Sequence, residues 1–252
     1  MQLAGAVALL TGASSGIGES TALALAAAGT RLIVTGRDAE RLRGVAARTD
    51  ATAVPADLAR PGAVEALTGS ALQVHGRIDV LICNAGVGWA GPVSEMPAAK
   101  AAELTAVNLL APVQLARLLL PGMIARRAGH LVFVSSVAGT TGVRNEAVYA
   151  ATKAGLNNLA ESLRYELAGT GVGISLILPG AVDTPFFSRR GKPYEQRRGW
   201  PALIASDRVA RAIVSAVTEH RAEIYVPGWL RFPARLHGAA PSAFRQVAGR
   251  FT

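Results

Sequence analysis

Short apolar runs alternate with segments of helical periodicity along most of the chain. The apolar runs predict strands at residues 7–11, 31–36, 52–56, 80–84, 130–136, 173–178 and 223–226. Helical spacing of apolar positions predicts helices at residues 17–28, 39–47, 61–75, 98–127, 147–168 and 209–220. Because the two kinds of element alternate and the strands are apolar on both faces, the pattern predicts βαβ units around a parallel, helix-covered sheet.

The predicted fold class is therefore α/β: one doubly wound, Rossmann-type domain over residues 1–252, with about seven parallel strands and helices on both faces. Pro112 lies inside the fourth predicted helix, so we expect a bend near it. Residues 185–205, rich in Gly, Pro and Arg, fit neither periodicity and follow a strand end, so we predict a lid over a substrate. Residues 227–252 form a C-terminal extension beyond the last strand, without a motif that we can match.

Composition and charge exclude several classes of protein. Half of the residues are hydrophobic and 17% are charged, as in a globular enzyme. Residues 1–10 lack a basic region and a cleavage site, and no uninterrupted apolar run reaches the ~18 residues of a membrane span. We therefore expect a cytoplasmic protein.

Cysteine and histidine usage gives no sign of a metal site. The single cysteine, Cys83, excludes a disulfide framework and is predicted to be a buried strand residue rather than a reactive thiol. The four histidines are scattered, at positions 75, 130, 220 and 237. We expect no bound metal.

The net charge of +9 comes almost entirely from arginine, since only three of the 26 basic residues are lysines. Many of the basic residues occur late in the chain: Arg189, Arg190, Lys192, Arg197, Arg198, Arg231, Arg235, Arg245 and Arg250. They could form a patch for an acidic partner, such as a phosphorylated carrier, or an ordinary solvated surface. We favour the surface, and no nucleic-acid-binding signature accompanies the charge.

A glycine-rich turn joins the first predicted strand to the first helix. Its small residues allow a sharp turn whose N–H groups approach a pyrophosphate at the helix N-terminus. The candidate cofactor-binding residues are Gly12, Ser14, Ser15, Gly16, Ile17 and Gly18.

The tip of the second strand bears on the choice between NAD(H) and NADP(H). The position expected to hold a carboxylate for the ribose 2′-hydroxyl is Gly36, and Arg37 follows it. Arginine can bind a 2′-phosphate, whereas Asp38 is better placed to cap the next helix. We therefore predict NADP(H) in preference to NAD(H).

Tyr149 and Lys153 lie four residues apart in a predicted helix, so the phenol and the ammonium share one face. An adjacent cation favours the phenolate, and we expect Lys153 to lower the pKa of Tyr149 from its usual value near ~10. Tyrosine so placed can act as a general acid and base.

Five motifs together resemble the short-chain dehydrogenase/reductase family, in its compact branch of about this length. They are Thr11–Gly18, Asn84-Ala85-Gly86, Ser136, Tyr149–Lys153, and Pro179-Gly180 followed by Thr184. The motifs occur in the family's order. The resemblance implies further cofactor contacts, by Asp57 and Leu58 to adenine, by Asn84, Ala85 and Gly86 to the adenine ribose, and by Pro179, Gly180, Val182 and Thr184 to nicotinamide.

The resemblance also implies catalytic roles. Ser136, thirteen residues before Tyr149, would hold the substrate oxygen; Tyr149 would donate the proton; Lys153 would bind the nicotinamide ribose. Asn108 matches the asparagine that anchors a proton-relay water in the family. Period-2 alternation places Ser135 on the opposite face from Ser136.

The implied reaction is NADPH-dependent reduction of a carbonyl, or its reverse. Apolar residues in and after the lid favour a lipophilic small-molecule substrate: Phe186, Phe187, Tyr194, Trp200, Trp229, Leu230 and Phe232. A 3-oxoacyl thioester on a carrier is the alternative substrate, and a non-catalytic dinucleotide-sensing or scaffold protein is the alternative class. The resemblance implies a homodimer or homotetramer built from the helices after the fourth and fifth strands. We consider oligomer packing a better explanation of the C-terminal segment than membrane contact.

Overall fold

The computed structural model describes residues 1–191 and 203–248. Predictions that concern the remaining residues lie outside the described part of the chain. They involve Lys192, Tyr194, Arg197, Arg198, Trp200, Arg250 and the side chain of Arg245.

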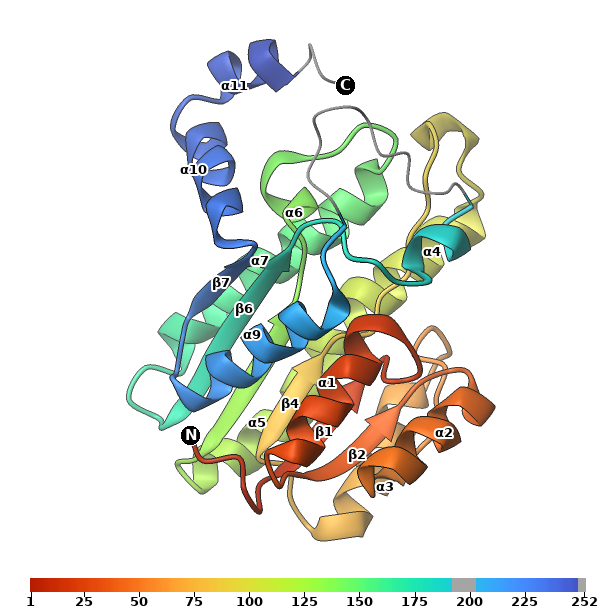
Figure 1. The fold of residues 1–252 in the computed structure, drawn as a ribbon, viewed down its shortest axis with the longest axis vertical. Helices are drawn as coiled ribbons and strands as arrows, with labels where there is room; N and C mark the ends of the chain where they lie inside the picture. Colours follow the sequence, from red (N-terminus) through yellow and green to blue (C-terminus); the bar gives the residue numbers. More distant parts are fainter. Residues whose placement is uncertain (192–202, 249–252) are drawn as a thin grey trace.

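Seven parallel strands form one sheet in the order β3-β2-β1-β4-β5-β6-β7 (Figure 1). The strands are β1 Val7–Thr11, β2 Arg31–Thr35, β3 Thr52–Ala53, β4 Val80–Cys83, β5 Gly129–Val134, β6 Val172–Pro179 and β7 Glu223–Val226. This arrangement confirms the predicted α/β, doubly wound fold. The strand order reverses between β1 and β4, and ligands of such folds bind at the carboxyl ends of the strands beside that point.

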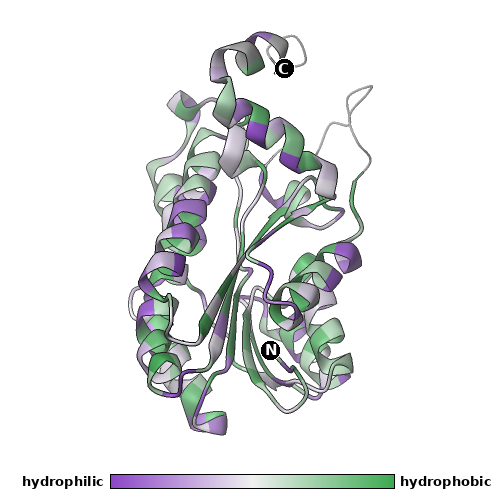
Figure 2. Ribbon diagram, turned by 90° about the vertical axis from the view of Figure 1, so that its left-hand side faces the viewer, coloured by the Kyte–Doolittle hydropathy of each residue, from purple (hydrophilic) through white to green (hydrophobic). Residues whose placement is uncertain are grey.

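Alternate residues of each strand pack into two separate cores. In β1, Val7 and Leu9 belong to the core under α3, α5 and α7, whereas Ala8 and Leu10 belong to the core under α1, α2 and α9. Figure 2 shows the sheet between these two helical layers. The covering helices are α1 Gly16–Ala27, α2 Ala39–Thr49, α3 Ala63–His75, α5 Ala111–Ala125, α7 Ala147–Glu166 and α9 Ser206–Thr218.

Shorter helices lie mostly toward the end of the molecule where the strands have their carboxyl ends (Figure 1). They are α4 Ala98–Thr105, α6 Ala138–Thr141, α8 Phe186–Arg189, α10 Arg231–Ala239 and α11 Pro241–Ala248, with single turns η1 Val93–Glu95 and η3 Gly228–Leu230. The predicted lid thus begins with a helical turn, α8. The C-terminal extension forms two helices, which the sequence analysis did not predict.

The third strand is shorter than the predicted 52–56. Val54 and Ala56 still donate backbone hydrogen bonds to carbonyls along β2, at 2.9 and 3.2 Å. Pro55 lies between them, and its missing N–H would face the open edge of the sheet, where no partner strand needs it. The regular strand nevertheless comprises only Thr52–Ala53. The fifth strand also ends early, at Val134, which places Ser135 and Ser136 in the loop beyond it.

The helix predicted at 98–127 is continuous over Ala98–Ala125 but contains a π-helical segment, η2, at Ala106–Leu110. Pro112 lacks the N–H that would bond the Asn108 carbonyl, so an irregular segment just before Pro112 is expected. Within the described residues, this helix alone is long and apolar enough to cross a membrane. Here Leu115, Leu119 and Met123 pack it into the core, as in a soluble protein.

Candidate active site

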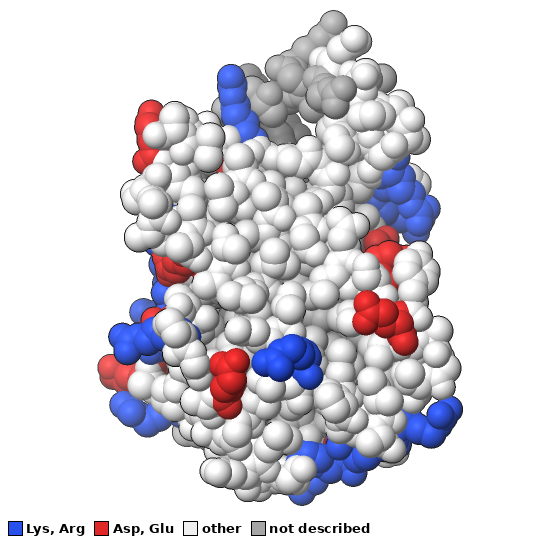
Figure 3. Space-filling view, turned by 180° about the vertical axis from the view of Figure 1, so that it is seen from behind, with Lys and Arg blue, Asp and Glu red and all other residues white. Residues whose placement is uncertain are grey.

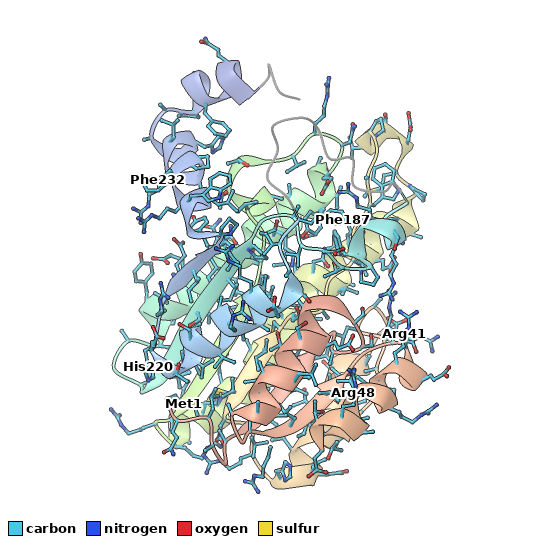
Figure 4. The ribbon with its side chains drawn as sticks, viewed as in Figure 1. Met1, Arg41, Arg48, Phe187, His220 and Phe232 are labelled. Atoms are coloured by element: carbon cyan, nitrogen blue, oxygen red, sulfur yellow. The ribbon has the colours of Figure 1, made fainter. Side chains whose placement is uncertain are left out.

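A cavity of about 1360 Å³ opens at the carboxyl ends of the strands, between the glycine-rich turn, α7 and α8. That volume exceeds the ~1,000 Å³ of the largest ordinary small-molecule sites, which leaves room for a dinucleotide and a substrate. Most of the predicted site residues line it: Gly12, Ser14, Ser15, Gly16, Ile17, Gly18, Arg37, Leu58, Asn84, Ala85, Gly86, Ser136, Tyr149, Lys153, Pro179, Gly180, Val182 and Thr184. Figure 4 labels two further lining residues, Arg41 and Phe187.

The glycine-rich turn is held against the loop after β4 by Asn84. Its side-chain amide donates to the carbonyls of Thr11 and Gly12, at 2.9 and 3.2 Å. A Cβ on Gly18 would collide with the Gly12 carbonyl oxygen and come within 2.7 Å of the Asn84 amide. Only glycine fits at position 18, and the close packing brings the start of α1 next to the cavity, as a pyrophosphate site requires.

Charged side chains surround the cavity at the tip of β2. The Arg37 guanidinium donates to the Glu103 carboxylate at 2.8 Å, and Lys100 donates to the same carboxylate at 2.5 Å. These bonds, first that of Lys100, lower the pKa of Glu103. Asp38 accepts from the Arg41 backbone N–H at 3.0 Å and so caps α2, as predicted. This end of the cavity therefore holds three cations, Arg37, Arg41 and Lys100, and two carboxylates, Asp38 and Glu103.

Asp57 does not line the cavity, and the adenine contact expected of it stays a prediction. Its carboxylate accepts from the Ala59 N–H at 3.2 Å and lies 3.6 Å from the Arg60 guanidinium. The early end of β3 lets the chain turn at Asp57, and the turn uses the side chain. Leu58 does line the cavity.

Ser136 and Tyr149 meet at the centre of the cavity. The phenol is half-buried, and its partial desolvation raises its pKa; a hydrogen bond with the Ser136 side chain opposes the rise. Ser136 is itself oriented by the Ala138 N–H, which donates to its hydroxyl at 3.1 Å. Tyr149 is therefore protonated at neutral pH, the state from which it can donate a proton.

Lys153 lies under Tyr149, with its ammonium 5.8 Å from the centre of the phenol ring. The ammonium is buried and donates to the Val134 carbonyl at 2.9 Å. Burial lowers its pKa to about 8. The prediction that Lys153 lowers the tyrosine pKa is wrong for this chain by itself, because desolvation of the phenol outweighs any effect of an ammonium that points at a backbone carbonyl.

Asn108 is fully buried in η2 and clamps neighbouring segments. Its amide donates to the Val87 carbonyl and to the Thr152 hydroxyl, at 2.9 and 3.2 Å, and its oxygen accepts from the Val87 N–H at 2.9 Å. Asn108 does not line the cavity; it joins the loop after β4 to α7, one residue from Lys153. The water-anchoring role stays a prediction.

The first residues of the lid cover the reaction centre. The Phe186 ring lies 5.5 Å from that of Tyr149, and Arg189 donates to the Ser15 hydroxyl at 3.3 Å. Arg190 forms an ion pair with Glu146, so it is not the solvated surface cation that we favoured. The sequence pattern identified Phe186 as an apolar residue of the lid. No sequence signal indicated that Glu146 would contact the lid through Arg190.

The C-terminal extension closes another side of the cavity. Trp229, Leu230 and Phe244 line it, although they come from segments without a recognisable motif. Phe232 is 61% exposed and does not line it. Across the described residues, no group of three or more histidine, cysteine or acidic side chains could hold a metal ion. Cys83 is buried at the end of β4, as predicted.

Comparison with known proteins connects this geometry to a chemistry. Residues 6–195 match the model of the short chain dehydrogenase family. The chain is 38% identical over 232 residues to the ketoacyl reductase HetN of Nostoc sp. PCC 7120, covering 89% of this chain and 79% of that protein.

Two solved structures share the fold along nearly the whole chain. One is a short-chain dehydrogenase/reductase from Burkholderia phymatum in complex with NAD, with a TM-score of 0.85, 27% identity and 95% of each chain covered. The other is a short-chain dehydrogenase from Sphingobium yanoikuyae in complex with NADPH, with a TM-score of 0.82, 28% identity, and 94% of this chain and 95% of that chain covered.

Proposed function

The chain belongs to the short-chain dehydrogenase/reductase family, and on that premise we propose that it is an NADP(H)-dependent oxidoreductase that interconverts a lipophilic ketone or aldehyde and the corresponding alcohol. One observation carries the proposal: a half-buried, protonated tyrosine hydrogen-bonded to a serine, beside a buried lysine, in a cavity with a pyrophosphate-type glycine turn. The aromatic rings of the lid and of the C-terminal helices on the cavity wall support a lipophilic substrate.

Each residue of the site has its own role in the proposed reduction. Ser136 and Tyr149 donate hydrogen bonds to the carbonyl oxygen, where negative charge develops, and Tyr149 then transfers its proton to that oxygen. Lys153 would bind ribose hydroxyls of the cofactor, and its ammonium keeps a positive charge near the phenolate. A reduced nicotinamide in the cavity supplies the hydride. Phe186 limits the access of water to the phenol.

Substitution of the tyrosine tests the mechanism. We expect Tyr149→Phe to lower kcat for ketone reduction by 100-fold or more, about the contribution of a general acid, with little change in the dissociation constant of NADPH. NADPH oxidation against a panel of ketones and aldehydes measures the first, and fluorescence titration the second. Near-wild-type turnover by the variant would overturn the assignment, and no turnover by the wild type with any carbonyl would favour the sensing or scaffold alternative.

The preference for NADP(H) is supported by Arg37, Arg41 and Lys100 around the tip of β2, where Gly36 replaces the carboxylate that binds NAD(H). Glu103 opposes it by holding Arg37. We expect Arg37→Ser to weaken NADPH about tenfold or more while NADH changes little, and Glu103→Gln to strengthen NADPH, since it releases Arg37. Equal effects on both cofactors would contradict the preference.

A 3-oxoacyl thioester is the second candidate substrate, favoured by the similarity to the ketoacyl reductase of Nostoc. The reaction would be the same, with the thioester chain in the lid region. Assays with acetoacetyl-coenzyme A and with simple aryl ketones, at equal concentrations of enzyme and NADPH, separate the two. A much larger kcat/KM for the thioester would assign the protein to carrier-linked substrates.

A further inference from the structure

A buried ion pair joins the lid to the catalytic helix inside the cavity wall. Glu146 immediately precedes α7, three residues before Tyr149, and Arg190 immediately follows α8. Their side chains are only 15% and 10% exposed, whereas most ion pairs among the described residues have a more exposed member, as Asp207–Arg211 does. Both residues line the cavity. Because solvent screens it little, this pair acts on whatever enters the cavity.

The pair also fixes the aromatic residues of α8. The Arg190 guanidinium lies 4.8 Å from the centre of the Phe187 ring, and the Arg190 carbonyl accepts from the Ala90 N–H at 3.3 Å. Phe186, in the same turn of helix, packs on Tyr149. A Cβ on Gly88 would lie 2.6 Å from the Phe186 ring, so the ring fits closely into the loop after β4. The ion pair thus holds an apolar wall beside the reacting phenol.

The two charges act on the phenol in opposite directions. Glu146 raises the pKa of Tyr149 and Arg190 lowers it, which places both within electrostatic range of the reaction centre. Burial raises the pKa of Glu146, and Arg190 opposes that rise. Since the carboxylate and the guanidinium cancel, the substrate end of the cavity gains two buried ionic groups without a net charge.

We propose that the Glu146–Arg190 pair determines substrate charge at this site: Glu146 neutralises the guanidinium beside Tyr149, so that the enzyme takes uncharged carbonyl compounds and rejects those bearing a carboxylate. The inference rests on the proposed carbonyl chemistry and narrows its substrate class. A carboxylate entering the cavity would lose its hydration, and Glu146 would cancel the attraction of Arg190. The selection is therefore made by Glu146, which prevents Arg190 from serving as an anion site.

The test compares two ketones that differ in charge alone. Methyl 4-acetylbenzoate is neutral, and 4-acetylbenzoate carries a carboxylate on the same skeleton. Their dissociation constants are measured by calorimetry on enzyme loaded with NADP⁺, which cannot reduce them, and their kcat/KM values are measured with NADPH. Binding reports the specificity independently of turnover.

Glu146→Gln keeps the shape and hydrogen-bonding ability of the side chain but removes one negative charge from the wall. We expect it to shift the binding ratio and the kcat/KM ratio toward the carboxylate by about tenfold or more, since a unit charge at ~6 Å and an effective dielectric of ~20 exceeds one tenfold step. Arg190→Met should shift both ratios in the opposite direction. The double variant, neutral again, should return them toward the wild-type values.

Asp207→Asn is the matched control, because it removes a carboxylate from an exposed ion pair with Arg211 on α9, outside the cavity wall. It should leave both ratios unchanged. If Glu146→Gln does not fold, Arg190→Met decides alone, and unchanged ratios would refute the inference. A shifted binding ratio without turnover by any variant would support the charge selection and refute the carbonyl reductase function. Turnover of ketones with unchanged ratios in every variant would support the carbonyl reductase function and refute the charge selection.

Discussion

At the scale of single residues, the chemistry of the site depends on burial as much as on spacing. The four-residue spacing correctly predicts that Tyr149 and Lys153 share one side of α7 and meet in the cavity. It does not reveal that both groups lose solvent contact, which raises the pKa of Tyr149 and lowers that of Lys153. Burial is set by segments far away in sequence, such as Phe186 above the phenol and Val134 at the ammonium.

The lowered pKa of Lys153 predicts how cofactor binding depends on pH. The ammonium is charged below pH about 8 and loses its proton above it, although a free lysine stays charged to about 10.5. We therefore expect the dissociation constant of NADPH to rise as pH increases from 7 to 9. In Lys153→Met, affinity should be weaker but nearly constant over this range. Fluorescence titration at each pH measures both, and a parallel pH dependence in the two proteins would contradict the prediction.

At the scale of elements, periodicity located all seven strands and the six long helices, because each must bury an apolar face. Periodicity could not predict the places where contacts with other segments decide the end of an element. The regular part of β3 ends at Ala53, and beyond it a local turn engages the Asp57 carboxylate with the Ala59 N–H. The helices α10 and α11 are amphipathic but only nine and eight residues long, and they were missed. The packing of Trp229 and Phe244 over the cavity has no local signal.

The glycine-rich turn allows a matched pair of substitutions. Gly18→Ala places a methyl group against the Gly12 carbonyl, so it should destabilise the protein by about 1–3 kcal/mol and weaken NADPH binding. Gly44→Ala, in the middle of α2, meets no atom within 4 Å and should stabilise by about 0.5–1 kcal/mol. Thermal denaturation and NADPH titration test both. Equal effects of the two substitutions would show that helix propensity, not the close approach, matters at Gly18.

His130, buried in β5, predicts a loss of stability in acid. Burial, the nearby His220 and the N-terminal ammonium lower its pKa from 6.5 to about 4. The unfolded chain therefore takes up a proton that the folded protein rejects, so the stabilisation is complete above pH 6.5 and is lost as pH falls toward 4. The free energy of unfolding falls by about 3 kcal/mol over this range, since each unit of pKa difference is worth ~1.4 kcal/mol. Urea unfolding at pH 7 and 4.5 should show a correspondingly smaller loss in His130→Gln; an equal loss would exclude His130 as its source.

At the scale of the whole molecule, charge is unevenly distributed. The side that carries α3, α5 and α7 is largely uncharged over its upper and central part, with basic and acidic side chains toward its lower part and margins (Figure 3). Leu110, Ile124 and Tyr165 are exposed on the segments around α5 and α7, by 49%, 39% and 72%. This surface supports the predicted homo-oligomer built from the helices after β4 and β5.

A charge introduced on that surface should disrupt the oligomer. We expect light scattering to give a dimer or larger species for the wild type, and a smaller species for Leu110→Glu at the same concentration, because the new carboxylate would be desolvated in the interface. Leu23→Glu is the control, since Leu23 is 40% exposed on α1, in the other helical layer. Unchanged mass for Leu110→Glu, or a monomeric wild type, would contradict this interface.

The chain leaves the sheet framework and returns to it at adjacent points. Val182 pairs with Ile204 as an isolated parallel bridge, and backbone bonds of 2.8 and 2.9 Å fasten Ile204 on both sides. The two ends of the predicted lid are therefore joined to each other by backbone hydrogen bonds. Because the cost of closing a loop rises only slowly with its length, insertions and deletions between fixed ends cost the rest of a fold little. The bridge therefore makes this stretch of the chain a suitable place to exchange sequence when the specificity of the site is engineered.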